Sequence, residues 1–302
     1  MVRVCRRDTE VMSNVDSPAV ARRRVRLALR AARVTKKLTQ SQVAKAMDWS
    51  LSKVIRIEKG EVNVSPSDLK VLLEHLDVTD PAKVEELLDD VRLSRSERWT
   101  ISTEDRHRYT PAMIELLQFE ADARTVRYYN GVVVPGPLQL RGYSEALFLD
   151  HPVPLETAVI NARVELRQVR RQRMYEPNAP DYLVLLDESV LMRPIGGPHL
   201  MAEQLELLMR MMDERRIQLR IAPLNGKIAS IFLGPFVLVD LEDDRSAMLY
   251  RESASTDETI HDPDEVEQHR VKFDVMWRRC LDRDDSRQLM AERAASFRDQ
   301  SD

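Results

Sequence analysis

The sequence predicts a two-domain protein, in which an all-α N-terminal domain precedes an α/β or α+β C-terminal domain with a sheet of about four strands. The chain has 302 residues, which is enough for two hydrophobic cores. Apolar residues recur at helical spacing through the first 95 residues, whereas short β-rich runs and helices alternate after residue 180. A polar stretch without clear periodicity, residues 96–110, is the predicted linker.

The N-terminal domain is predicted over residues 18–95, after a disordered leader at residues 1–17. Its helices are recognised by residues that commonly precede or begin a helix. These residues are Pro18, Thr39, Ser50, Ser65 with Pro66, and Asp80 with Pro81. Gly60 is expected to end the helix that Ser50 begins, as a left-handed residue. The pattern therefore predicts five or six short helices joined by short turns.

The C-terminal domain is predicted over residues 111–302. Its four predicted strands are the runs DYLVLLDE, IQLRIAP, PFVLVDLE and SAMLYRE. Helical patterns surround these strands near residues 111–130, 138–150, 156–175, 199–214, 264–280 and 284–298.

The net charge of −4 for the whole chain conceals an asymmetry. Residues 1–60 hold 15 Lys and Arg against 5 Asp and Glu, a net charge of +10, whereas the remainder holds 31 against 45, a net charge of −14. A basic segment on an acidic body indicates that one domain contacts a polyanion. A solvated, charge-rich helix is the alternative, but it does not predict that charge segregates by region.

No catalytic, metal or cofactor site is recognisable. The histidines are dispersed, and Cys5 and Cys280 lie far apart without neighbouring ligand residues, which favours a reducing compartment. The basic N-terminus has no apolar segment, and no apolar run approaches the roughly 20 residues that cross a bilayer. We therefore expect a cytoplasmic protein that has no membrane partner, no bound cofactor and no enzymatic activity.

The stretch TQSQVAKAMDWSLSKVIRIEKG, residues 39–60, has the pattern of a DNA-reading helix pair. Val43, Ala44, Met47, Val54 and Ile57 would form the inner faces of the two helices. The outward positions of the second helix are Leu51, Ser52, Lys53 and Arg56. Gln40, at the start of the first helix, can place its amide against a phosphate. The alternative is a helical hairpin that contacts no DNA.

This stretch, within residues 20–76, resembles the lambda-repressor-like helix-turn-helix family in its Xre-type branch. The resemblance implies an ion pair between Arg33 and Glu58, and it maps the family's base and phosphate contacts onto Gln40, Leu51, Ser52, Lys53 and Arg56. The family usually has glycine where this chain has Lys37 and Asp48, which affects the expected loop geometry. Leu51 would contact a thymine methyl group.

Two features of the C-terminal region are candidate ligand or partner surfaces. Asp187 and Glu188 end a predicted strand, where ligands often bind in α/β sheets; the simpler alternative is that they cap the next short helix. Gly196 and Gly197 precede a helix and could bind an anion, although they match no nucleotide-binding motif. An arginine stripe (Arg163, Arg167, Arg170 and Arg171) is explained by carboxylate pairing or by a solvated face.

A second resemblance covers about residues 110–285, and its most specific blocks are VPGPLQL and DESVLMRPIGGP. These are similar to the C-terminal domain of actinomycete regulators of the WhiJ type. Pro137 and Leu140 depart from that pattern, which puts the usual hydrogen bonding of the loop in question. The resemblance implies a developmental regulator that is often encoded beside a small partner protein, as in antitoxin-like pairs.

These observations predict a sequence-specific, nucleoid-associated transcription regulator that binds a double-stranded DNA operator as a homodimer. Its C-terminal domain would mediate dimerisation and bind a small protein partner or effector. One alternative is an antitoxin-like protein that neutralises a small partner and regulates its own expression. The other is a DNA-tethered enzyme that acts through Asp187 and Glu188.

Overall fold

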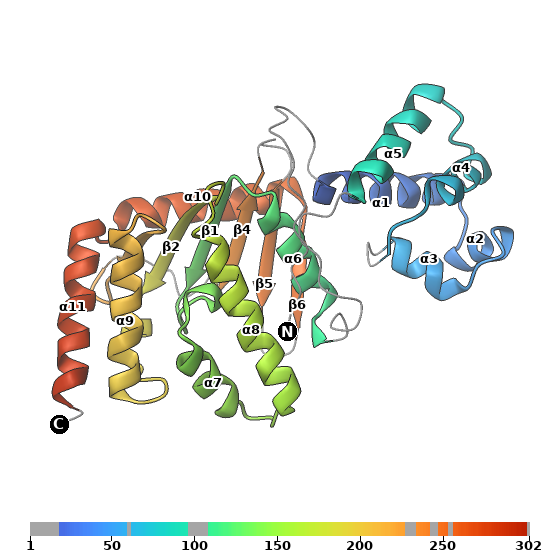
Figure 1. Ribbon diagram of the computed structural model, residues 1–302. Coiled ribbons are helices and arrows are strands. Elements are labelled where there is room, and N and C mark those ends of the chain that lie inside the picture. Colours follow the sequence, from blue (N-terminus) through green and yellow to red (C-terminus); the bar gives the residue numbers. More distant parts are fainter. Residues whose placement is uncertain are drawn as a thin grey trace. The chain divides into compact units, whose positions relative to one another are not determined.

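The computed structural model describes residues 18–58, 62–95, 108–226, 234–241, 247–252 and 256–300 (Figure 1). The described residues 18–95 and 117–122 form one compact unit, and the described residues 108–116 and 123–300 form the other, so helix α6 (Pro111–Ala121) is divided between them. The first unit is helical and the second is α/β, so the predicted fold class is confirmed. The predicted leader, Gly60 and all but the last residues of the predicted linker lie outside the described residues.

The described part of the N-terminal region contains five α-helices. They are α1 (Pro18–Thr35), α2 (Gln40–Ala46), α3 (Leu51–Glu58), α4 (Pro66–His75) and α5 (Pro81–Ser94). The predicted cap residues are confirmed, because the side chains of Thr39, Ser50, Ser65 and Asp80 each accept a hydrogen bond from a backbone N–H in the first helical turn. Thr39 and Gln42 also form a reciprocal capping box.

Aliphatic side chains from all five helices form one core in this unit. Its buried members include Leu29 of α1, Val43 of α2, Val54 of α3, Leu72 of α4 and Leu88 of α5. Each helix therefore buries one apolar stripe and leaves its charged face to solvent, as amphipathic helices do.

Within the described ranges, four helices end in the same hydrogen-bonded motif with a non-glycine residue in the left-handed conformation. The residues are Lys37 (φ 56°), Asp48 (φ 53°), Asp77 (φ 59°) and Arg215 (φ 57°). After α2, for example, the N–H of Trp49 donates to the carbonyl of Ala44 and that of Asp48 to the carbonyl of Lys45, which is a Schellman motif. Lys37 and Asp48 thus adopt the glycine-like conformation that the family pattern implies for these two positions.

The C-terminal unit is built on a six-stranded mixed sheet in the order β3-β2-β1-β4-β5-β6. The strands are β1 (Thr125–Asn130), β2 (Asp181–Asp187), β3 (Gln218–Ala222), β4 (Phe236–Asp240), β5 (Ala247–Glu252) and β6 (Asp257–Ile260). Strands β1, β2 and β3 are parallel, whereas β4, β5 and β6 pair antiparallel.

The prediction of about four strands is therefore wrong by two, β1 and β6. The helical pattern near 111–130 continues into TVRYYN, yet α6 ends at Ala121 and β1 follows because it pairs on both sides, with β2 and β4. Strand β6 has only four residues, and among the described strands it pairs with β5 alone. Strand β1 depends on partners far away in the sequence, which local periodicity does not report, whereas β6 is too short and polar to give a strand pattern of its own.

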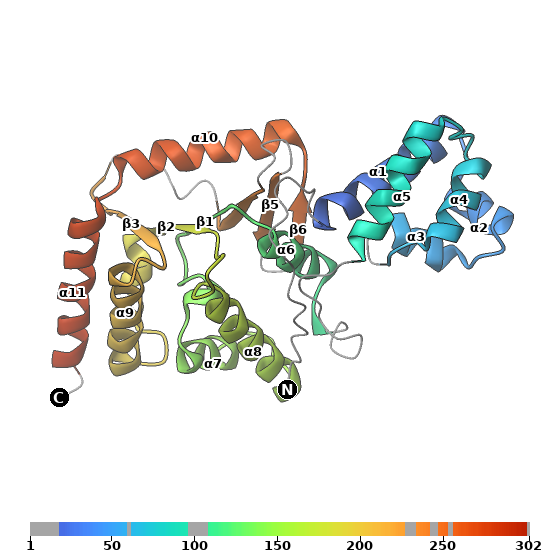
Figure 2. The same cartoon turned by 45° about the horizontal axis from the view of Figure 1, so that its top comes forward.

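Helices cover both faces of this sheet (Figure 2). Helices α7 (Arg141–Leu149), α8 (Thr157–Arg173) and α9 (Pro198–Asp213) lie on one side, and α10 (Pro263–Arg279) crosses the other. Phe273 and Met276 of α10 pack against Tyr129, Phe236 and Leu249 of the sheet. Because α8 and α9 connect parallel neighbours, they are the crossover helices that such strands require.

The outer edge of β3 is covered by the segment that ends α10 and begins α11 (Arg283–Asp299). The N–H of Leu281 donates to the carbonyl of Ile221 (3.0 Å), and the N–H of Ile221 donates to Ser286 Oγ (3.0 Å). Helix α11 then packs along α9. The chain thereby satisfies backbone groups that an open edge strand would present to other molecules.

Two buried amide side chains hold the loop between β1 and α7, which contains the VPGPLQL block and the short helix η2 (Gly136–Leu138). Gln139 Nε2 donates to the carbonyl of Val134 (2.6 Å), and Gln139 Oε1 accepts from Ser144 Oγ and Arg167 Nη1. Gln204 accepts from the N–H of Leu140 and donates to the carbonyl of Leu138. The loop is thus fully hydrogen-bonded at these points, despite Pro137 and Leu140.

Candidate nucleic-acid interface

Helices α2 and α3 meet at a tight turn centred on Asp48. Ala44, which is 4% exposed, lies where the two helices approach each other, and Val54 and Ile57 bury the inner face of α3. The carbonyl of Ala44 accepts the N–H of Trp49 (2.8 Å), which reverses the chain before Ser50 caps α3. Packing and turn geometry together leave the opposite face of α3 outward.

Three side chains on that outward face are exposed. Leu51 is 45% exposed, and Ser52 and Arg56 are also exposed. Among the residues that the structure describes, the side chains of Ser52 and Arg56 make no hydrogen bond or ion pair. Both polar groups can therefore contact an external ligand without breaking an internal bond.

Lys53 belongs to the same predicted set but is bound within the protein. Its Nζ lies 3.1 Å from Asp68 Oδ2 of α4 and 3.7 Å from the centroid of the Trp49 ring. Neither partner was predicted from the sequence. Asp68 follows Ser65 by three residues, and its position in the first turn of α4 already explains a carboxylate there, so the sequence carries no separate signal for this contact.

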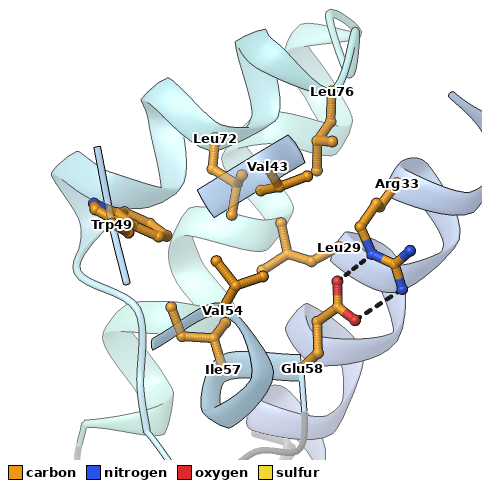
Figure 3. Close-up of a pocket in the computed structure, with 9 residues that line it drawn as sticks. All are labelled: Leu29, Arg33, Val43, Trp49, Val54, Ile57, Glu58, Leu72 and Leu76. Carbon is orange, nitrogen blue, oxygen red and sulfur yellow. Dashed lines mark hydrogen bonds and ion pairs between the residues drawn. The ribbon is translucent and has the colours of Figure 1, made fainter. Parts of the chain in front are cut away.

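Arg33 and Glu58 connect α1 to the end of α3 (Figure 3). Arg33 Nε donates to Glu58 Oε1 (2.6 Å), and its Nη2 donates to Oε2 (2.9 Å). Arg33 Nη1 also donates to the carbonyl of Leu38, which follows the turn at Lys37. The pair lines a cavity of about 10 Å³ with Leu29, Val43 and Leu76, room for about one water molecule.

Gln40 contacts the same carboxylate, since its Nε2 donates to Glu58 Oε2 (2.8 Å). Desolvation alone would raise the pKa of Glu58, but the hydrogen bonds from Arg33 and Gln40 and the Arg33 charge outweigh it, and the pKa is lowered. One N–H of the Gln40 amide is thus committed to Glu58, and the second remains for a ligand.

In the C-terminal unit, the candidate acidic residues have internal partners. Asp187 caps the short helix η3 (Glu188–Leu191) by accepting from the N–H of Ser189 (3.0 Å). Glu188 accepts from the N–H of Leu224 (2.9 Å) and pairs with Arg293 (3.2 Å). The capping alternative therefore describes Asp187, and Glu188 ties the loop after β3 to α11.

Gly196 and Gly197 are explained by the backbone. Both have positive φ, 73° and 96°, a conformation that side chains disfavour. A Cβ atom on Gly196 would lie 2.4 Å from Leu200 Cδ2. These glycines make the turn into α9, and nothing in their geometry requires an anion.

The arginine stripe of α8 is not explained as predicted. Arg167 donates to Gln139 Oε1 (2.6 Å) and stacks 4.3 Å from the centroid of the Phe148 ring, and Arg171 donates to the carbonyl of Gln139 (3.2 Å). Among the described residues, neither forms a close ion pair with a carboxylate, although the charge of Glu252 acts on Arg167, and both are partly buried. Burial lowers the pKa of Arg167 to about 10, so the prediction of carboxylate pairing or a solvated face is wrong for these two residues.

Two features are absent from the described ranges. No helix there is both long and apolar enough to span a membrane. No group of three or more His, Cys, Asp and Glu side chains is arranged there to hold a metal ion.

Comparison with known families gives two matches. Residues 24–87 match a family model described as a helix-turn-helix domain. Residues 113–292, more than half of the chain, match the model described as a domain of unknown function, DUF5753. Neither description names the Xre branch or regulators of the WhiJ type. No curated protein and no solved structure matches the chain.

Proposed function

The chain belongs to the DUF5753 family, and because a helix-turn-helix domain precedes that domain, we propose that it is a sequence-specific DNA-binding transcription regulator. The observation that carries the proposal is the outward face of α3. There Ser52 and Arg56 are exposed and without internal partners among the described residues, while the opposite face is packed into the core. That is the arrangement by which a recognition helix enters the major groove.

Individual residues would have different roles in the complex. Arg56 would donate to a base edge, and a guanine is the commonest partner of such a side chain. Leu51 would contact a thymine methyl group, and Ser52 a base or a phosphate. Gln40, oriented by Glu58, would use its remaining N–H on a phosphate. The net charge of +10 on residues 1–60 would supply the sequence-independent attraction.

The finer part of the proposal concerns assembly. We propose an Xre-type regulator that binds as a homodimer to two half-sites about one helical turn apart. By its resemblance to WhiJ-type regulators, the C-terminal domain would mediate dimerisation and bind a small protein encoded nearby. An antitoxin-like role is distinguished by co-purification with that protein. Under the enzymatic alternative the acting carboxylates would be Asp187 and Glu188, both of which also make internal contacts, and loss of turnover in Asp187→Ala would be its test.

Selection of bound genomic fragments by the full-length protein tests the central claim. We expect enrichment of one motif with two half-sites about 10 base pairs apart. The same selection with the neighbouring small protein present should change the enrichment if that protein is the partner. Recovery of the input distribution, with no motif enriched, would refute sequence-specific binding.

A further inference from the structure

Lys53 differs from its neighbours on α3 because its charge is already neutralised within the protein. Its ammonium group contacts the Asp68 carboxylate at 3.1 Å and lies over the Trp49 ring. The Lys53 and Asp68 side chains are 32% and 37% exposed, so the pair lies at the surface and is accessible to solvent. Arg56, one turn further along α3, has no such partner among the described residues.

Both contacts come from elements that frame α3. Trp49 belongs to the turn before α3, and its partly buried ring packs against the core (Figure 3). Asp68 is in the first turn of α4, where its N–H donates to the cap residue Ser65 (2.9 Å). The backbone of both partners is therefore held in place, and the ammonium group of Lys53 has a defined position.

We propose that Asp68 competes with DNA phosphate for Lys53 and thereby limits how tightly the domain binds DNA of any sequence. The inference rests on the proposed DNA-binding function and adds a regulating residue to it. A carboxylate and a phosphate are alternative anionic partners for the same ammonium group. A lysine that neutralises a DNA phosphate releases a cation condensed on the DNA. Because Asp68 already neutralises Lys53, this release requires that the phosphate displace the Asp68 carboxylate.

This competition is energetically feasible. A solvent-exposed ion pair contributes little to stability, so a phosphate can replace the carboxylate at little cost. The Trp49 ring would keep the ammonium group near its present position after the exchange. Since phosphate contacts carry no sequence information, weakening one of them lowers non-specific binding and raises the ratio of specific to non-specific affinity.

A double-mutant cycle in the full-length protein tests the proposal. Asp68→Asn, Lys53→Met and the double variant are titrated against a 30-base-pair duplex of unrelated sequence at several salt concentrations, with fluorescence anisotropy as the readout. We expect Asp68→Asn to bind about fivefold more tightly near 0.15 M salt, with a salt slope steeper by about 0.9, as one added phosphate contact predicts. Lys53→Met should change the wild-type affinity less than twofold and abolish the whole gain of Asp68→Asn.

Glu86→Gln is the matched control. Like Asp68→Asn, it removes one negative charge from an ion pair with a lysine, because Glu86 Oε2 lies 2.8 Å from Lys83 Nζ. This pair lies on α5 and not beside α3. Glu86→Gln should leave affinity and salt slope unchanged. Asp68→Ser repeats the test with a different uncharged side chain, and the thermal midpoint of each variant is measured beside the titration.

The outcomes separate the inference from the function on which it rests. Absence of binding by the wild type to any duplex overturns both. If the wild type binds but Asp68→Asn does not raise the affinity, only the competition is overturned. The same conclusion follows if Asp68→Asn raises the affinity equally in the Lys53→Met background, or if Glu86→Gln raises it as much.

Discussion

Arg33 and Glu58 form a two-pronged ion pair between α1 and α3, with nitrogen–oxygen distances of 2.6 and 2.9 Å. The side chains are only 14% and 8% exposed, so the pair is largely removed from water. A third bond from Arg33 reaches the carbonyl of Leu38, and Gln40 donates to the second oxygen of Glu58. One carboxylate thus fixes the end of α3 relative to both α1 and α2.

Removing that carboxylate should destabilise the helix-turn-helix domain strongly. Glu58→Ala would leave the Arg33 guanidinium largely buried without a counter-charge, and the expected loss is about 3 kcal/mol in the free energy of unfolding. Urea unfolding measures the loss, and hydrogen exchange in peptides of α1 and α3 localises it. Glu86→Gln, at an exposed pair, is the control and should have no measurable effect. An equal loss in both variants would mean that Arg33–Glu58 is no stronger than a surface pair.

The lowered pKa of Glu58 predicts how this stability depends on pH. A carboxyl group whose pKa is lower in the folded than in the unfolded state stabilises the fold above its unfolded pKa, and the stabilisation disappears as pH falls through the folded pKa. Since the ordinary pKa of a glutamate side chain is about 4.5, the contribution of Glu58 should be complete above about pH 4.5 and decline below it. Wild type and Glu58→Gln should therefore converge in thermal midpoint on acidification. A difference that stays constant to pH 2 would contradict this assignment.

The left-handed residue after α1 should be a point of strain. Lys37 has φ 56°, where a side chain costs roughly 1–2 kcal/mol and glycine costs little. Lys37→Gly should therefore stabilise the domain by about 0.5–1 kcal/mol, after the larger unfolded-state entropy of glycine is included. Lys45→Gly, the same substitution inside α2, should instead destabilise it by about 1 kcal/mol. The two thermal midpoints should move in opposite directions; a downward shift for Lys37→Gly would remove the strain argument.

The helix starts of the first domain were predictable because their signals are local. Thr39 and Ser65 bond to N–H groups three residues away, so the pattern is complete within one turn. The Arg33–Glu58 contact, in contrast, was implied only by family resemblance, since 25 residues separate its partners. The contact between Lys53 and Asp68 had neither a local signal nor a family pattern.

In the second domain, the information missing for β1 and for the arginines of α8 was also non-local, whereas β6 was missed because it gives no strand pattern of its own. Strand β6 is short and polar and exists because it pairs with β5, and β1 follows α6 directly within an apparently helical pattern. The arginines of α8 were recognised as a stripe. Their partner Gln139 was not, because it lies in a loop and contacts Arg167 and Arg171 from 28 and 32 residues away.

Gln139 should be essential to the second domain. It is 1% exposed, and its side chain bonds to Val134, Ser144 and Arg167. Gln139→Ala would leave a buried carbonyl, a hydroxyl and a guanidinium N–H without this partner, and we expect a loss of about 2–4 kcal/mol in unfolding free energy. Chemical denaturation, with hydrogen exchange of α7 and α8, measures it. Gln172→Ala, at an exposed position of α8, is the control; comparable effects of the two would contradict the role of the buried amide.

Arg56 and Gln40 should affect DNA binding in different ways. If Arg56 reads a base edge, Arg56→Ala should weaken operator binding by about 1–3 kcal/mol, or roughly 5- to 150-fold, and reduce discrimination against a mutated operator. If Gln40 contacts a phosphate, Gln40→Ala should weaken operator and unrelated duplex by the same factor and reduce the salt slope by about 1. Arg210→Ala removes an exposed arginine from α9 and should change neither affinity nor discrimination. Competition titrations with the operator, its mutated form and the unrelated duplex measure these affinities and the discrimination between the duplexes. Each variant is first shown to be folded under the conditions used. Loss of the Arg56 charge alone would weaken binding to every duplex equally, as loss of a phosphate contact does. If Arg56→Ala leaves discrimination unchanged, Arg56 contacts the DNA backbone, and other residues of α3 read the sequence.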